Sequence, residues 1–482
     1  MPVNGRSLYP RRVILLSAAS LLLLASCVTV GPDYQPPPSA VAHTWQVQDV
    51  AIASAPAMLQ AWWQQLADPV LSQLIMQALA ANPDLDIAAA RLRESRARLG
   101  VNNATRLPSL SASAAARRSA ASDSRSTEIY TLGFDASWEL DLFGGRRRTL
   151  EAASADYQVA EASLHDVQVT LVAEVARNYA NYRSLEQRLS LARTNLDSQL
   201  ETLQLVRWRE QAGLVSGLDT AQARAEAEQS RAQLPRLASS QRQAALRLAG
   251  LLGQAPGTLP VLLAPAPASL VVPASLAVGI PAEVLRQRPD VIAAERRLAA
   301  ETARIGVAEA ALYPSLNLSG SLGLSATSPG RLVSDGTSSD SSNFGINLPL
   351  FNGGRLRQAL ALQSAVQEQA LLNYEKTLLA ALEDVENALF GMVSNRARIE
   401  ALTAAADAAN AAALLARQRY TSGLVDFAVV LTTERSQRSV EDSLVSARND
   451  EILAVISLYK ALGGGWPATT VTPPASDPQV TL

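Results

Sequence analysis

Alternating apolar and polar residues predict β-strands in two separate parts of the chain. From Tyr130 onward the apolar members are Leu132, Phe134, Ala136, Trp138, Leu140 and Leu142. Their neighbours are small, hydroxylated or acidic: Gly133, Asp135, Ser137, Glu139 and Asp141. Successive side chains of a strand point to opposite faces, so this strand has one apolar and one polar face. We predict a β-hairpin over residues 109–142 and a second, with the same alternation, over residues 315–351.

Each predicted β-hairpin is followed by a very long helical pattern. No proline occurs between Arg146 and Pro235, and apolar residues there step by three and four, as in a coiled coil. A helix from Arg146 to about Ala212 would be about 100 Å long. We predict helical hairpins over residues 146–252 and 355–462, with tips at Gly213 and Gly423, because helices often end at glycine.

An internal repeat connects these patterns. Residues 82–110 and 288–316 share a Pro-Asp start, an Arg-Leu pair, an Arg-x-Gly-Val stretch and a Pro-Ser-Leu end. The chain therefore divides into a first repeat over residues 69–252 and a second over residues 283–462. A linker rich in proline and alanine, residues 253–282, joins them. The Pro/Thr-rich residues 463–482 are predicted to be a disordered tail.

The N-terminus carries the pattern of a secretory signal. Arg11 and Arg12 precede an apolar run that is too short to be a comfortable transmembrane helix, and small residues follow it. The sequence Leu-Ala-Ser-Cys then resembles a bacterial lipobox. We predict that residues 1–26 are removed, that Cys27 carries N-acyl and S-diacylglycerol lipid, and that residues 27–68 form a leader. The alternative is an ordinary signal peptide that happens to contain a cysteine.

The strands favour a membrane channel. Each is about ten residues long, which suits a tilted membrane-spanning strand. The carboxylates of Asp135, Glu139 and Asp141 share one face, as expected for a water-filled lumen. Four strands cannot close a barrel, and an open sheet edge cannot persist in lipid. Two chains would give a nearly filled eight-stranded barrel, so three chains are the better guess for a conduit. We therefore predict an α+β membrane protein in which three chains form a twelve-stranded transmembrane β-barrel, continued by a long periplasmic α-helical barrel.

Composition and motifs exclude several other functions. The formal charge is −2, without a polybasic patch, which argues against nucleic-acid binding. We find no catalytic constellation, no metal-ligand spacing and no phosphate-binding glycine loop, so we expect no enzyme activity and no cofactor beyond the lipid on Cys27. A coiled-coil surface lipoprotein is the main rival, but it leaves the paired amphipathic strands without a purpose.

Several long motifs resemble the outer-membrane efflux lipoproteins, the TolC-like channels of tripartite pumps. They are the leader GPDYQPP, the stretch RPDVIAAERRLAAETARIGVAEAALYPSLNLSG, the segment PLFNGGRLR and the ending SLYKALGGGW. The resemblance implies a homotrimer in the outer membrane that conducts drugs or other small molecules. It also implies two partners, a periplasmic adaptor and an inner-membrane transporter of the RND type. Secreted proteins or metal ions are alternative cargoes for the same fold.

The resemblance also implies a periplasmic aperture at the helical hairpin tips. Its matching residues are Tyr420 and Asp219, which would tie the coils together, with Asp426 beside them. A commonly acidic position twelve residues after the tyrosine is Thr432 here, so an acidic ring is in doubt. The alternatives are interhelical packing for Tyr420 and a helix N-terminal role for Asp219. If Asp135, Glu139 and Asp141 line the lumen, the pore should prefer cations, unless Arg117 and Arg146 neutralise them.

Overall fold

The computed structural model describes residues 29–37, 45–46, 59–120, 126–257, 263, 270–273, 287–334 and 336–466. These residues fall into two compact units, one built around the β-sheet and one around the helical hairpins. The helices are α3 (Pro69–Ala81), α4 (Pro83–Ala104), α5 (Gly145–Gln211), α6 (Gly217–Leu251), α8 (Pro289–Ala310), α9 (Arg355–Thr421) and α10 (Phe427–Ala461). The strands are β1 (Ser109–Ser119), β2 (Thr127–Leu140), β3 (Ser315–Ala326) and β4 (Ser338–Asn347), and short 3-10 helices lie at Trp62–Leu66 and Pro329–Arg331.

The repeat in the sequence is a repeat of structure. The helices α5 and α9 each have 67 residues and begin at positions 145 and 355, an offset of 210 residues. The helices α6 and α10 each have 35 residues and keep that offset. The shorter helices α4 and α8 each have 22 residues and begin at positions 83 and 289, an offset of 206 residues. Each half therefore supplies a short helix, a β-hairpin and a long helical hairpin.

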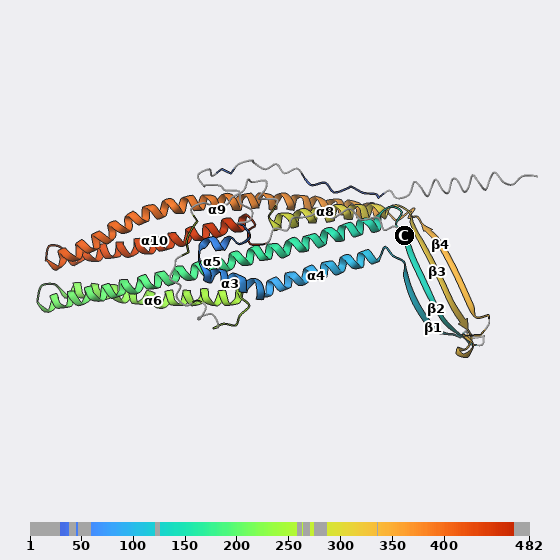
Figure 1. The fold of residues 1–482 in the computed structure, drawn as a ribbon, viewed down its shortest axis with the longest axis horizontal. Coiled ribbons are helices and arrows are strands. Elements are labelled where there is room, and N and C mark those ends of the chain that lie inside the picture. The colour runs from blue at the N-terminus through green and yellow to red at the C-terminus, as the bar shows by residue number, and fades with distance from the viewer. Residues whose placement is uncertain are drawn as a thin grey trace, which may run out of the picture. The chain divides into compact units, whose positions relative to one another are not determined.

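The four strands form one antiparallel sheet in chain order, β1-β2-β3-β4 (Figure 1). In all three registers even-numbered residues face even-numbered ones, so the apolar side chains share one face of the sheet. That face is open: Phe134 is 57% exposed, Leu322 61% and Ile346 66%. A soluble sheet buries its apolar face, whereas an uncovered one suits contact with lipid.

The strands extend beyond the stretch with clear alternation. Residues 117–128 and 327–342 are mostly polar, yet β1 continues to Ser119, β2 starts at Thr127 and β4 starts at Ser338. Arg118 still pairs with Glu128 in the ladder, and their side chains form an exposed ion pair. Backbone pairing does not require an apolar face, so the ladder runs further than the hydrophobic pattern.

The described leader residues, 29–37, bind to the bend between β2 and α5. The guanidinium of Arg148, which is buried, donates to the carbonyl oxygens of Val30 and Gly31 and to the carboxylate of Asp33. The amide of Val30 donates to the carbonyl oxygen of Phe143 at 3.1 Å. A Cβ on Gly31 would lie 2.4 Å from the Cα of Gly306, so this close approach requires glycine. Cys27 itself lies outside the described residues.

The core of the helical unit gathers around Trp62. Its ring stacks on Tyr459 with centroids 5.0 Å apart, and the hydroxyl of Tyr459 donates to Gln65. Burial raises the pKa of Tyr459 to about 12. The segment Gly463–Trp466 was expected to belong to a disordered tail, yet Gly465 donates to the carbonyl oxygen of Leu59. The ring of Trp466 stacks on His165. The segment after α10 thus packs on the core, and of the predicted tail residues 467–482 lie outside the described part.

Helices α3 and α4 were expected as one helical stretch, but they are two helices separated at Asn82. The Oδ1 atom of Asn82 accepts the amides of Asp84 and Leu85, which caps α4. Its Nδ2 atom donates 2.8 Å to the carbonyl oxygen of Leu251, the last residue of α6. Arg288 occupies the matching position in the second repeat and donates 2.9 Å to Ala461, the last residue of α10. In both halves, therefore, the side chain just before the short helix donates to the last carbonyl of the returning helix, although the side chains differ.

We predict that Asn82→Ala lowers the stability of the helical unit by about 2 kcal/mol, because one cap is lost and the partly buried carbonyl of Leu251 loses its donor. The exposed Asn103, on the same helix, gives the matched variant Asn103→Ala, which should cost under about 0.5 kcal/mol. Thermal unfolding in detergent, followed by circular dichroism, measures the difference. Equal melting temperatures for the two variants would contradict the capping role.

Candidate functional site

The two helical hairpin tips have the same backbone geometry. Gly213 and Gly423 have φ angles of 73° and 74°, in the left-handed region. In the first tip the amide of Gly213 donates to Glu210 and that of Leu214 to Arg209, both at 2.8 Å. The second tip repeats this pair of bonds, which is a Schellman motif. The glycines predicted to end the helices therefore do so, and any functional difference between the tips comes from side chains.

Tyr420, on the last turn of α9, joins the two tips within one protomer. Its side chain is 3% exposed and lies 5.6 Å, centroid to centroid, from the ring of Phe427. It belongs to a buried apolar cluster to which all four long helices contribute: Leu196, Leu203, Val206, Ala223, Ala227, Ala416, Phe427, Val430 and Leu431. Its hydroxyl has no hydrogen-bond partner among the described residues. Burial raises the pKa of Tyr420, and Asp219 adds to the rise while Arg209 opposes it.

Arg209 makes the direct contact between the first tip and Tyr420. Its guanidinium carbon lies 4.5 Å from the centroid of the tyrosine ring, and Nη1 donates to the tyrosine carbonyl oxygen. In the second repeat the matching residue is Arg419, which is exposed. Sequence reasoning missed Arg209, although comparison of the repeats marks the place: the position after it is Glu210 in one half and Tyr420 in the other.

The other predicted aperture residues are spread over the tips. Asp219, in the first turn of α6, is half-buried, and its carboxylate accepts the amide of Ser216 at 3.3 Å. Asp219 therefore caps its own helix, the alternative raised by the sequence, while lying close enough to affect the pKa of Tyr420. Asp426 is exposed just before α10, and the exposed Thr432 donates to the carbonyl oxygen of Ala428.

Further along the same helices, a charged cluster links α6 to α10. Glu226 is 9% exposed and accepts from Arg435 Nε at 2.8 Å and Arg438 Nη2 at 2.7 Å. Arg438 also donates to Ser230. Burial opposes ionisation of Glu226, but the bonds from both arginines outweigh it and lower its pKa. Because these bonds are charge-assisted, the carboxylate ties the two hairpins together more strongly when it is ionised.

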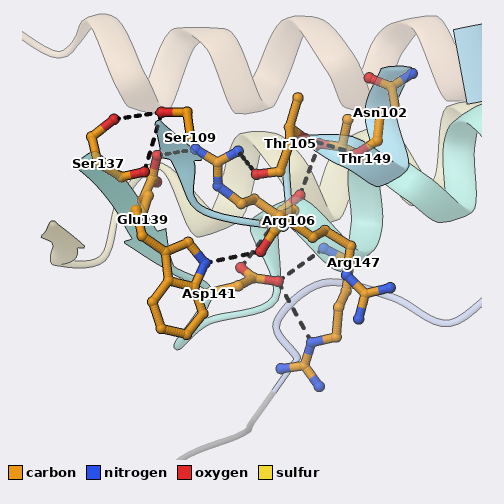
Figure 2. A network of polar contacts seen from close by, with 12 residues as sticks. Asn102, Thr105, Arg106, Ser109, Ser137, Glu139, Asp141, Arg147 and Thr149 are labelled. Atoms are coloured by element: carbon orange, nitrogen blue, oxygen red, sulfur yellow. Dashed lines mark hydrogen bonds and ion pairs between the residues drawn. The ribbon is translucent and has the colours of Figure 1, made fainter. Parts of the chain in front are cut away.

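The acidic residues predicted to face the lumen have different surroundings, and Figure 2 shows those of Glu139 and Asp141. Asp141 lies just beyond β2, and its two oxygens accept the amides of Arg146 and Arg147, so it caps α5 instead of lying on the strand. Glu139 is paired with Arg146 at 2.5 Å, the neutralisation that the sequence left open. Asp135 accepts from Ser113 at 2.9 Å and has no arginine partner within the described residues.

Comparison with known proteins agrees with this architecture. The family model described as outer membrane efflux protein matches residues 74–254 and 280–464. The pyoverdine export outer membrane protein OpmQ of Pseudomonas aeruginosa is 33% identical over 469 residues, which cover 94% of this chain and 98% of OpmQ. The probable outer membrane lipoprotein SilC of Salmonella typhimurium is 30% identical, and the alignment covers 94% of this chain and 98% of SilC. The solved structure of the outer-membrane channel OprN superposes with a TM-score of 0.84 at 37% identity, covering 91% of this chain and 99% of OprN.

The chain belongs to the outer membrane efflux protein family. It is an outer-membrane channel of a tripartite efflux system, as the sequence motifs predicted. The α+β fold expected from the sequence is confirmed as well. The efflux channel is therefore located in the outer membrane and extends into the periplasm.

We predict that Glu226→Gln destabilises the efflux channel by about 2 kcal/mol at neutral pH, because two arginines lose a buried charged partner and one of them stays partly solvated. The pKa of this carboxyl is lowered on folding, so its contribution is present above the ordinary value and is lost as pH falls through the lowered one. The deficit should thus shrink on acidification. Thermal unfolding at several pH values measures it.

The matched control is Glu228→Gln on the same helix. Glu228 pairs with Arg231, and both side chains are about half exposed. Its loss should cost under about 1 kcal/mol. A Glu226 deficit no larger than the Glu228 deficit, or one that does not depend on pH, would rule out the proposed tie between the hairpins.

Proposed function

We propose that the efflux channel is a homotrimer that passively conducts small molecules through a twelve-stranded barrel and a helical tube. This proposal rests mainly on the sheet. Its apolar face is uncovered, and its opposite face carries hydroxyl, amide and carboxylate groups. Three copies supply a lumen wide enough for cargo, whereas two copies would give an eight-stranded barrel that side chains fill. The relative OpmQ is a pyoverdine export protein, which favours small molecules over secreted proteins or metal ions as cargo.

Exposed apolar residues on the long helices support lateral assembly. On α9, Leu372, Leu379 and Phe390 are 57%, 66% and 68% exposed. By length and composition α9 is apolar enough to cross a membrane, and one such helix is weak support for a span. Side-by-side packing of three copies would cover these side chains in the periplasm. The adaptor and the RND-type transporter complete the pump in this proposal.

Lipidation of Cys27 fits the described leader. Thr29 lies against Gly144 at the strand-to-helix bend. The described leader therefore begins beside the ends of the strands, two positions after the cysteine that we propose to be acylated. The relative SilC is described as a probable outer membrane lipoprotein, which supports the same modification here. Several acyl chains would give stable anchoring.

The tips form the closing aperture in this proposal. Replacing Tyr420 by Phe leaves the protomer packing intact, since the hydroxyl has no partner in the described protomer. We predict that Tyr420→Phe and Asp219→Ala each raise the conductance of the closed channel in planar bilayers about twofold or more, with the Tyr420→Phe melting temperature unchanged. Arg209→Ala should raise conductance too, because the two tips lose their direct contact.

Arg419→Ala is the control for Arg209→Ala, because it removes the same side chain from the matching, exposed position of the second tip. It should conduct like the wild type. Wild-type conductance in Tyr420→Phe and Asp219→Ala together would overturn the aperture assignment, and equal effects of the two arginine variants would remove Arg209 from it.

Asp135 is the carboxylate that we expect to give the lumen its preference for cations. Glu139 and Asp141 are already paired or used as a cap. We predict that Asp135→Asn reduces cation selectivity, measured as reversal potential in a salt gradient, more than Glu139→Gln does. An anion preference in the wild type would contradict a cation-selective lumen.

A further inference from the structure

We propose that β4 of one copy pairs antiparallel with β1 of the next copy in the register that sets Gly345 opposite Ala115. In this register Asn347 faces Ser113 and Asn343 faces Arg117. The inference rests on the proposed trimeric channel and specifies, residue by residue, the interface that closes it. The occupant of both open sheet edges is thus a second copy of this chain.

The backbone groups on the two edges restrict the possible registers. The amide of Ser325 donates to the carbonyl oxygen of Thr337 at 2.8 Å, so odd-numbered residues of β4 direct their backbone groups toward β3. Backbone direction alternates along a strand, so even-numbered residues of β4 point to the open edge. Following the registers back through β3 and β2 shows that even-numbered residues of β1 also point outward. Only even-to-even registers bond these edges, and the same registers keep all apolar side chains on one face.

The internal repeat supplies a copy of this interface inside the protomer. The pair Ser109–Ser137 of β1 and β2 corresponds to Ser315–Asn347 of β3 and β4, with offsets of 206 and 210 residues. The contact between β2 and β3 is therefore the within-chain equivalent of the contact between β4 and the next β1. Its pair Asp135–Ser321 transfers by these offsets to Gly345–Ala115.

The ends of the strands favour the same register. It sets Ser109, the first residue of β1, opposite Phe351, the last residue before the turn at residues 352–354. Leu350 and Phe351, which are 87% and 93% exposed in the protomer, then have partners, and Leu350 faces Leu110. A slip of two residues one way places Ser109 opposite Gly353, whose φ of 61° ends the extended chain. A slip the other way leaves Leu350 and Phe351 unpaired.

The register also fixes the size of the barrel. A line drawn across the strands from Ser109 passes through Ser137, Ser319 and Asn343 and reaches Arg117 of the next copy. The strand register therefore shifts by eight residues from one copy to the next around the barrel. Twelve strands with this stagger at ordinary strand spacing close at a backbone radius of roughly 15 Å, which leaves an open lumen.

Cysteine pairs test the register directly. Facing odd-numbered residues on the two edges are not hydrogen-bonded to each other, which brings their side chains close enough for a disulfide. Gly345→Cys would be combined in turn with Ala115→Cys, Ser113→Cys and Arg117→Cys in the full-length channel. After mild oxidation, non-reducing electrophoresis should show covalent trimers for the Ala115 pair at least tenfold faster than for the other two. Gly345→Cys alone should give none.

The within-chain pair Asp135→Cys with Ser321→Cys is the matched control and should close within one chain. Faster cross-linking by Ser113 or Arg117, or none by any pair while this control closes, would overturn the register. Native mass spectrometry in detergent tests the trimeric channel separately from the strand register. Trimers with a different cross-link would leave the proposed channel standing, whereas a monomer would overturn both.

Discussion

The structure depends on the need to pair every backbone group of a sheet that lies in lipid. Four strands of one protomer satisfy three ladders and leave one edge of β1 and one of β4 open. In water such edges would be hydrated, but in the hydrocarbon each unpaired group costs several kcal/mol. The uncovered apolar face prevents the sheet from staying in water, and the open edges prevent one copy from staying alone in lipid. Assembly is therefore part of folding for this chain.

Duplication offers a simple solution to that constraint. The two halves have identical helix lengths and the same tip geometry, so they present nearly the same scaffold twice. The differences concentrate in side chains that bear on the tips: Glu210 against Tyr420, and Asp219 against Val429. One half contributes a buried aromatic ring and the other an arginine that covers it. The two halves thus share one backbone design but differ in the side chains at their tips. A tube built from them can therefore close through contacts that are not the same in the two halves.

Much of the fold could be predicted from the sequence, because long helices and amphipathic strands leave strong periodic patterns. The boundaries of α6 and α10 and the glycines at both tips follow from local chemistry alone. The break at Asn82 was missed, since its amide acts on a carbonyl 169 residues away. The role of Arg209 was missed for the same reason, because its partner Tyr420 is 211 residues away. Asp141 was assigned to the strand by its alternation, although it caps α5 through amides only five and six residues away. Gly463–Trp466 appeared to belong to a polar tail, but tertiary contacts with the core decide its state.

The hydrogen bonds of Arg148 link the N-terminal leader to the start of the first long helix. With an acylated Cys27, that link would confine each newly exported chain to the inner surface of the outer membrane before its strands insert. Three copies would then search for one another in two dimensions instead of three, at a much higher effective concentration. The leader would thus act on the kinetics of assembly, well before any cargo passes, and a chain without it would be slower to assemble although its finished pore were the same.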